Sequence, residues 1–212
     1  MSRVLLSAIL LSILGLGAAT PAFAKIDPVN CEAPGLITLV ARGADGTADP
    51  IGTFTVFVRD FNNVPSENEM VSLDFQNCPD IRLCMDQDDP RVTVDCAGRS
   101  VSARTGPDGA ASFRVIGCAV NQGSSPGAIA PTLIVFAEGV YITTARVAAL
   151  DQNGGGVDGS DLSMVLDDYF SGQPFARSDY DGNGVLTGND LSLWLAAYFK
   201  AGSAVSGGAA CP

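Results

Sequence analysis

Oxygen-bearing side chains recur along a short stretch near the C-terminus, and their spacing suits a hard cation. Between Asp179 and Asp190, such side chains stand at positions 1, 3, 5, 9 and 12 of the stretch. Calcium takes about six to eight oxygen ligands, and a loop supplies them by turning sharply and aiming alternate residues inward. Gly184, at position 6, allows this turn because it has no side chain to clash at positive φ. The expected ligands are Asp179, Asp181, Asn183, the carbonyl of Val185, Thr187 and Asp190.

This spacing follows the EF-hand calcium pattern, except that Asp190 replaces the usual glutamate at position 12. A second stretch, residues 151–161, has a similar composition but is one residue shorter, and it has glycine where a position-5 ligand is expected. Because fewer charged ligands and a looser loop lower the affinity for calcium, we expect one tighter site and one weaker or vacant site. The candidate ligands of the shorter loop are Asp151, Asn153, Asp158 and Asp161.

Each acidic loop is followed by a segment with helical periodicity. Apolar residues recur at i, i+3, i+4 and i+7 in both segments, which predicts one buried face on each helix. Helices this short are not stable alone, so we expect the two faces to pack on each other, with their aromatic residues in the core. The faces comprise Leu162, Val165, Leu166 and Tyr169 in the first segment and Leu191, Trp194, Leu195 and Tyr198 in the second.

No helix is expected to lead into either loop, because Gly172 and Pro174 separate the repeats and a β-rich segment precedes the first loop. Such half EF-hands in tandem resemble type I dockerins, which bind cohesin domains in the presence of calcium. The resemblance covers roughly residues 151–202, and it implies a Ca²⁺ cofactor and a cohesin-like partner or self-assembly. It is carried by Asp179, Asp181, Asn183, Gly184, Thr187, Asp190 and Leu191. The family's recognition positions fall here on Gly159, Ser160, Gly188 and Asn189, of which Ser160 and Asn189 have polar side chains.

Upstream of the loops, short β-prone runs alternate with turn residues. Several runs alternate apolar and polar side chains, as Val71, Leu73 and Phe75 do, so each is expected to bury one face. Eight such runs without helical periodicity predict a β-sandwich, and hence a mainly β fold with a small α part. The expected strands are 36–41, 52–60, 70–75, 91–95, 100–104, 111–116, 132–137 and 140–147.

This part resembles the bacterial immunoglobulin-like domains of the invasin and intimin type. The resemblance rests on the runs 56–60, 71–75 and 105–113, and it implies a spacer or adhesive module. A cysteine-rich insertion, residues 78–96, departs from the family pattern and contains three acidic residues: Asp86, Asp88 and Asp89. Such a triplet either binds a further cation, performs acid–base work or is a solvated loop, and we favour the solvated loop.

The N-terminus carries export features. Arg3 precedes an apolar run over residues 4–16 and an A-x-A motif ending at Ala24, which predicts a secretory signal peptide over residues 1–24. The run is shorter than the roughly 20 residues that span a bilayer. The six cysteines lie beyond this segment, and an even number in an exported chain indicates disulfides. The expected pairs are Cys78–Cys84, Cys96–Cys118 and Cys31–Cys211, of which only the first is favoured by closeness in sequence.

Composition narrows the function. A net charge of −11 argues against binding to nucleic acids or anionic lipids. The chain has no histidine and no G-x-S-x-G motif, and this argues against common catalytic sites and against zinc. We therefore expect a secreted or cell-surface, non-catalytic protein with an immunoglobulin-like domain (25–148), a dockerin-like calcium-binding domain (149–203) and a tail (204–212). The alternative is a polysaccharide-binding or glycoside-active protein that is anchored through its dockerin-like part.

Overall fold

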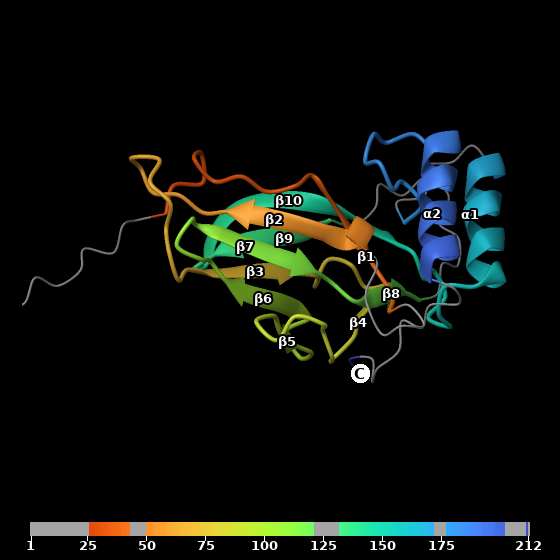
Figure 1. The fold of residues 1–212 in the computed structure, drawn as a ribbon, viewed down its shortest axis with the longest axis horizontal. Coiled ribbons are helices and arrows are strands. Elements are labelled where there is room, and N and C mark those ends of the chain that lie inside the picture. Colours follow the sequence, from red (N-terminus) through yellow and green to blue (C-terminus); the bar gives the residue numbers. More distant parts are fainter. Residues whose placement is uncertain (1–25, 43–49, 121–131, 172–176, 202–210, 212) are drawn as a thin grey trace, which may run out of the picture.

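The computed structural model describes residues 26–42, 50–120, 132–171, 177–201 and 211 (Figure 1). Over these residues the fold is mainly β, with two helices near the C-terminal end. The predicted signal peptide and most of the predicted tail lie outside the described residues. None of the helices in the described part is long and apolar enough to cross a membrane.

The largest sheet has six strands. Its order is β1 (Leu36–Leu39), β10 (Val140–Ala149), β9 (Leu133–Ala137), β3 (Met70–Asp74), β6 (Ser100–Arg104) and β5 (Thr93–Asp95). The first strand pairs in parallel with β10, and the other neighbours are antiparallel. Two antiparallel ladders accompany this sheet: β2 (Thr53–Phe57) with β7 (Ala110–Arg114), and β4 (Ile81–Leu83) with β8 (Gly117–Ala119). A 3-10 turn, η1 (Pro50–Gly52), precedes β2.

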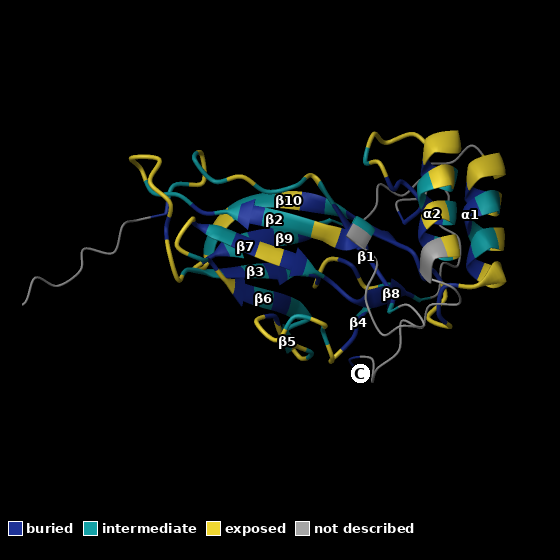
Figure 2. Ribbon diagram, in the orientation of Figure 1, coloured by how far each residue is buried: buried dark blue, intermediate teal, exposed yellow. Residues whose placement is uncertain are grey.

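The main core lies between the six-stranded sheet and the β2–β7 ladder. Val71, Leu73 and Phe75 are fully buried, whereas the intervening Ser72 and Asp74 are half-buried, as their alternation predicts. Side chains of β7 and β9 join the same cluster, and Figure 2 shows this buried band running through the strands. The alternating pattern therefore directs one face of each strand into a shared core.

The mainly β character predicted from the sequence is confirmed. All eight expected strands are present, although most are one to several residues shorter than predicted. The short strands β4 and β8 were not predicted. β4 lies inside the cysteine-rich insertion, and β8 follows the strand predicted at 111–116, in a stretch for which no strand was predicted.

The helices α1 (Gly159–Ser171) and α2 (Gly188–Ala201) lie side by side at one end of the β-rich part (Figure 1). Their buried faces include Val165 and Trp194, which pack in one cluster with Val40 and Leu150 of the β-rich part. The helix faces thus pack against the end of the sheets as well as on each other. Tyr169 is 36% exposed, so the prediction that every aromatic residue of these faces lies in the core is wrong for this residue.

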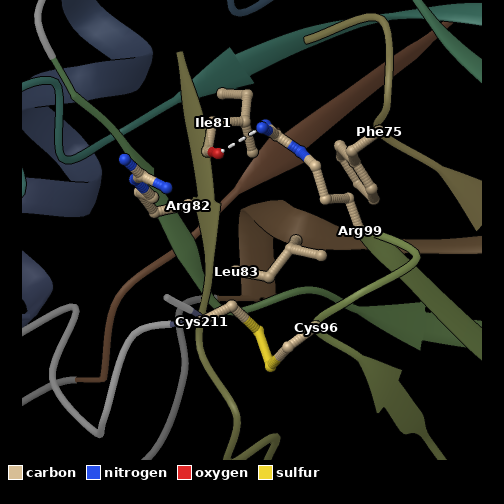
Figure 3. A pocket seen from close by; sticks show the side chains of 7 residues that line it. All are labelled: Phe75, Ile81, Arg82, Leu83, Cys96, Arg99 and Cys211. Carbon is tan, nitrogen blue, oxygen red and sulfur yellow. Dashed lines mark hydrogen bonds between the residues drawn. A yellow bond between two sulfur atoms is a disulfide. The ribbon is translucent and has the colours of Figure 1, made fainter. Parts of the chain in front are cut away.

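The predicted disulfide pairs are wrong. The structure joins Cys96 to Cys211, which fixes the C-terminal end of the chain beside β4 (Figure 3). Both Cys31 and Cys84 are thiols, so neither Cys31–Cys211 nor Cys78–Cys84 is formed, and Cys96–Cys118 is excluded by the observed bond. Closeness in sequence supported only Cys78–Cys84, and it could not reveal a bond across a sequence separation of 115 residues, which depends on where the fold brings Cys211.

Candidate metal centre

Three carboxylates of the second acidic loop converge. Asp179, Asp181 and Asp190 each place one oxygen within 4.8 Å of the others. Asp190 is supplied by the first turn of α2, and the other two residues come from the loop that precedes this helix. Asp179 and Asp190 are buried, whereas Asp181 is exposed. The cluster therefore has the composition of a cation site that opens to solvent on one side.

The local fold of this loop depends on its glycines and on Asp190. Gly182 and Gly184 have φ values of 74° and 85°, which a residue with a side chain adopts at a cost. Asp190 accepts hydrogen bonds from the backbone N–H groups of Tyr180 at 2.8 Å and Thr187 at 2.9 Å. Because this carboxylate also lies at the N-terminal end of a helix, the helix dipole favours its negative charge. Asp190 thus closes the loop from within the first turn of α2.

Asp179 has one satisfied and one unsatisfied oxygen. Its Oδ2 accepts hydrogen bonds from Arg146 Nη1 at 2.6 Å and from the Gly184 N–H at 2.9 Å. Its Oδ1 is buried and has no hydrogen-bond partner among the described residues. Burial raises the pKa of Asp179 above its ordinary value, and the nearby Asp190 acts in the same direction. A buried carboxylate oxygen normally has a partner, so this oxygen is suited to a bound cation.

The remaining residues predicted for this loop surround the cluster. Asn183 Nδ2 donates to Asp181 Oδ2 at 2.9 Å, and the Thr187 hydroxyl donates to Asp190 Oδ2 at 3.2 Å. Val185 is 60% exposed, in keeping with the expectation that its carbonyl, not its side chain, is the ligand. The loop thus places an amide group and a hydroxyl group beside the carboxylates, and Asn183 Oδ1 accepts the Val185 N–H.

The four predicted recognition positions, Gly159, Ser160, Gly188 and Asn189, are exposed on the first turns of α1 and α2. Asn189 also contributes to the cluster. Its Nδ2 donates to Asp181 Oδ2 at 2.8 Å, and this hydrogen bond lowers the pKa of Asp181. Asn189 therefore holds a candidate ligand in place.

The first acidic loop repeats the same backbone arrangement. The Gln152 N–H donates to Asp161 Oδ1 at 2.6 Å, as the Tyr180 N–H does to Asp190. Both Gly154 and Gly156 have positive φ values, like the two glycines of the second loop. The β strand β10 leads into this loop, so no helix enters it. The sequence repeat is therefore also a structural repeat.

The ligand arrangement of the two loops nevertheless differs. Among the described residues, Asp151, Asp158 and Asp161 do not form a second cluster of three converging carboxylates. Both oxygens of Asp151 accept backbone N–H groups of their own loop, including that of Gly156 at 2.9 Å. Asn153 is exposed and accepts the Gly155 N–H at 2.6 Å. Burial raises the pKa of Asp161 to about 6. The geometry thus distinguishes the loops in the direction that their sequences predict.

Sequence reasoning missed two arginines that connect the loops to the β-rich part. Arg146 of β10 contacts Asp179 and also donates to the Gly182 carbonyl. Arg177 is 2% exposed, and it donates to both oxygens of Asp80 at 2.7 Å and to the Val147 carbonyl at 2.7 Å. Arg177 lies two residues before the first ligand, where the EF-hand pattern makes no demand. Its approach to Asp80 depends on the tertiary fold.

The acidic triplet of the insertion does not converge in the same way. Asp88 pairs with Arg42 at 2.7 Å and Asp89 with Arg91 at 2.6 Å. The hydrogen bond from Arg91 lowers the pKa of Asp89. Two of these acids line an open groove of about 410 Å³ beside β2 and β7, together with Thr53, Pro90, Arg91, Ser112, Phe113 and Arg114. This triplet is therefore a surface loop held by arginines.

A second hollow lies beside the disulfide. Figure 3 shows Arg99 extending past Phe75 to donate to the Ile81 carbonyl, at 2.9 Å. The hollow, which Cys96 and Cys211 also line, has a volume of about 20 Å³. A cavity of this size has room for about one water molecule. It therefore belongs to the packing of Cys211 against β4.

Comparison with known proteins adds no relative. No protein-family model, curated protein or solved structure matches this chain.

Proposed function

We propose that this chain is an exported, non-catalytic calcium-binding modular protein. Its dockerin-like loop–helix part would be stabilised by calcium and attach to a cohesin-like protein or to a second copy of the chain. The immunoglobulin-like β-sandwich would act as a spacer or adhesive domain at the cell surface. The observation that supports this proposal most strongly is the buried Oδ1 of Asp179 within the carboxylate cluster, for which the described part of the chain supplies no hydrogen-bond partner.

Calcium suits this cluster better than other common metals. The candidate ligands are carboxylate, amide, hydroxyl and carbonyl oxygens, whereas zinc sites are built mainly from cysteine and histidine. The chain contains no histidine. Magnesium requires a nearly ideal octahedron and retains several waters, whereas calcium accepts the irregular geometry of a flexible loop. A twelve-residue loop with two positive-φ glycines provides such flexibility.

We infer that the ion acts as a folding clip. Three carboxylates whose oxygens lie within 4.8 Å of each other repel when they are ionised, and a divalent ion offsets this repulsion. Because the ion would bind the folded loop and not the unfolded chain, it would stabilise the folded state by about 2.7 kcal/mol when the free ion concentration is a hundredfold above Kd. The helix α2 begins within the loop, so its position depends on the same contacts.

Thermal unfolding with and without calcium tests this proposal. We expect a chelator to unfold α1 and α2 while the β-rich part stays folded. Trp194 is the single tryptophan, it is fully buried in α2, and its Nε1 donates to the Leu150 carbonyl at 3.0 Å. Its fluorescence therefore reports on the helices, and circular dichroism at 222 nm gives an independent readout. Signals that do not change when chelator is added would refute the clip.

Exposed aromatic residues support attachment through the helices. Phe170 and Phe199 occupy equivalent positions of the two repeats and are 78% and 75% exposed. Large exposed apolar side chains are common at protein–protein contacts. Sedimentation in calcium and in chelator, with a Phe170→Ser/Phe199→Ser variant as control, tests self-assembly. A cohesin-like protein recovered from the source secretome by wild type, but not by this variant, would establish docking.

The groove beside β2 and β7 supports the second candidate function, polysaccharide binding or glycoside activity. It combines the hydroxyl groups of Thr53 and Ser112 with the carboxylates of Asp88 and Asp89, which suit the hydroxyl groups of a sugar. A screen of soluble polysaccharides against the full chain, with Ser112→Ala as a control, separates the two candidates. Binding that depends on Ser112 would favour this second function.

A further inference from the structure

The second acidic loop rests on one pair of neighbouring strand residues. Leu36 of β1 and Arg146 of β10 are paired in register, and both contact the loop. A methyl group on Gly182 would lie 3.2 Å from the side chain of Leu36, and Arg146 Nη2 donates to the Gly182 carbonyl. The β-rich part therefore supplies both the apolar support and the nearest cationic side chain that the structure describes at this loop.

Arg146 supplies part of the positive charge that a bound cation would bring to the carboxylates. Its Nη1 lies 2.6 Å from Asp179 Oδ2, and the side chain of this aspartate is 6% exposed. One positive charge, on a side chain that is 35% exposed, is thus held against one carboxylate of the cluster, where it reduces the repulsion among the three. The other oxygen of Asp179 has no donor among the residues that the structure describes, so the loop holds a counter-ion and still presents a ligand.

This arrangement has two effects on a divalent ion. An ion bound at Asp179 Oδ1 would share that carboxylate with the guanidinium, and the two positive charges repel. The ion pair also holds the loop in its folded form before the ion binds, which by itself favours binding. The repulsion outweighs this gain, because both positive charges act on one buried carboxylate.

The first acidic loop contacts other residues of the β-rich part than the second loop does. A methyl group on Gly154, the equivalent of Gly182, would lie 3.0 Å from Val120 and 3.7 Å from the sulfur of Cys118. Asp151, the equivalent of Asp179, accepts hydrogen bonds from backbone N–H groups of its own loop. The arginine contact therefore distinguishes the second loop from the first.

We propose that Arg146 is an internal counter-ion that sets the calcium threshold of the second loop. This inference rests on the proposed calcium function of that loop. Arg146 makes the fold of the loop less dependent on calcium and raises the calcium concentration at which the site fills. The β-rich part thereby controls the affinity of a site that lies in the loop–helix part.

Calorimetric calcium titration of full-length Arg146→Met tests the proposal. We expect its Kd for calcium to fall about tenfold, equivalent to about 1.4 kcal/mol. Arg146→Gln removes the charge but keeps a donor, so it should show the same change if the Met variant folds poorly. Arg146→Lys keeps the charge and should bind calcium as wild type does.

Arg104→Met is the matched control for net charge. Arg104 is exposed on β6 and lies 3.9 Å from Glu138, so its removal should leave the calcium affinity unchanged. Wild type that binds calcium, with an Arg146→Met variant of equal or weaker affinity, overturns the counter-ion role while the calcium function stands. Binding by Arg146→Met alone supports the counter-ion role. Absence of calcium binding in both wild type and Arg146→Met contradicts the calcium function, and with it the proposal that Arg146 sets the calcium concentration at which the site fills.

Discussion

A buried ion pair joins the loop–helix part to the β-rich part, and removing its acidic partner should destabilise the protein strongly. Arg177 precedes the second acidic loop, and its side chain is 3% exposed. Its guanidinium donates two hydrogen bonds to Asp80. Asp80 lies near the start of the cysteine-rich insertion. Asp80→Asn leaves the guanidinium buried without a counter-charge, although the Val147 carbonyl still accepts one of its hydrogen bonds.

The expected loss follows from the burial of the two partners. Removing one member of a fully buried ion pair costs about 3–5 kcal/mol, because the remaining charge is left desolvated. The Asp80 side chain is 27% exposed, so water partly screens this ion pair in the wild type, and the cost of losing the pair is lower. We therefore expect a loss of about 2–3 kcal/mol from a stability that is typically about 5–15 kcal/mol.

Urea unfolding of wild type and Asp80→Asn, in saturating calcium, measures this loss. Trp194 fluorescence follows the helices, and far-ultraviolet circular dichroism follows the whole chain. Asp89→Asn is the control, because its partner Arg91 is 78% exposed and the pair should contribute little. A midpoint for Asp80→Asn that equals that of the control would refute the role of the buried pair.

Three further predictions concern the stability of the same regions. Burial raises the pKa of Asp168 from 3.8 to about 6, so the folded chain binds this proton more tightly than the unfolded chain does. The contribution of Asp168 to stability should therefore fall as the pH rises from about 4 to about 6. Asp168→Asn should remove this slope from urea midpoints measured across that range, and an unchanged slope would contradict the assignment. The Cys96–Cys211 bond closes a sequence separation of 115 residues, so a Cys96→Ser/Cys211→Ser variant should lose about 2–5 kcal/mol in urea unfolding, and a loss near zero would show that the bond contributes little. Gly184→Ala places a side chain at φ 85° and should cost about 1–2 kcal/mol while weakening calcium binding in the same titration; normal binding would show that the turn tolerates a side chain.

Local patterns predicted most of the secondary structure. Alternation in Val71, Leu73 and Phe75 identified buried strand faces, because a strand places successive side chains on opposite sides whatever its partners are. The oxygen spacing of the second loop identified residues that converge in the fold, because a loop closed by its own backbone depends on short-range contacts. Val165 and Trp194 were likewise found on buried helix faces.

Contacts between residues that are far apart in the sequence could not be predicted from local patterns. The partner of Cys96 is Cys211, and this pairing depends on where the C-terminus returns in the fold. Arg146 reaches Asp179 from a neighbouring strand, so charge and spacing within the loop gave no sign of it. Tyr169 lies on the predicted face of α1, yet the end of the β-rich part covers only a portion of that face and leaves this residue exposed.

Calorimetric titration of the full-length chain with calcium tests the central claim, that the second acidic loop holds the ion. We predict one tighter site and one weaker or vacant site. Asp179→Ala should abolish the tighter site, whereas Asp151→Ala should leave it intact, because Asp179 alone of this pair belongs to the converging carboxylates. Two equal sites, or a tighter site that persists in Asp179→Ala, would contradict the claim.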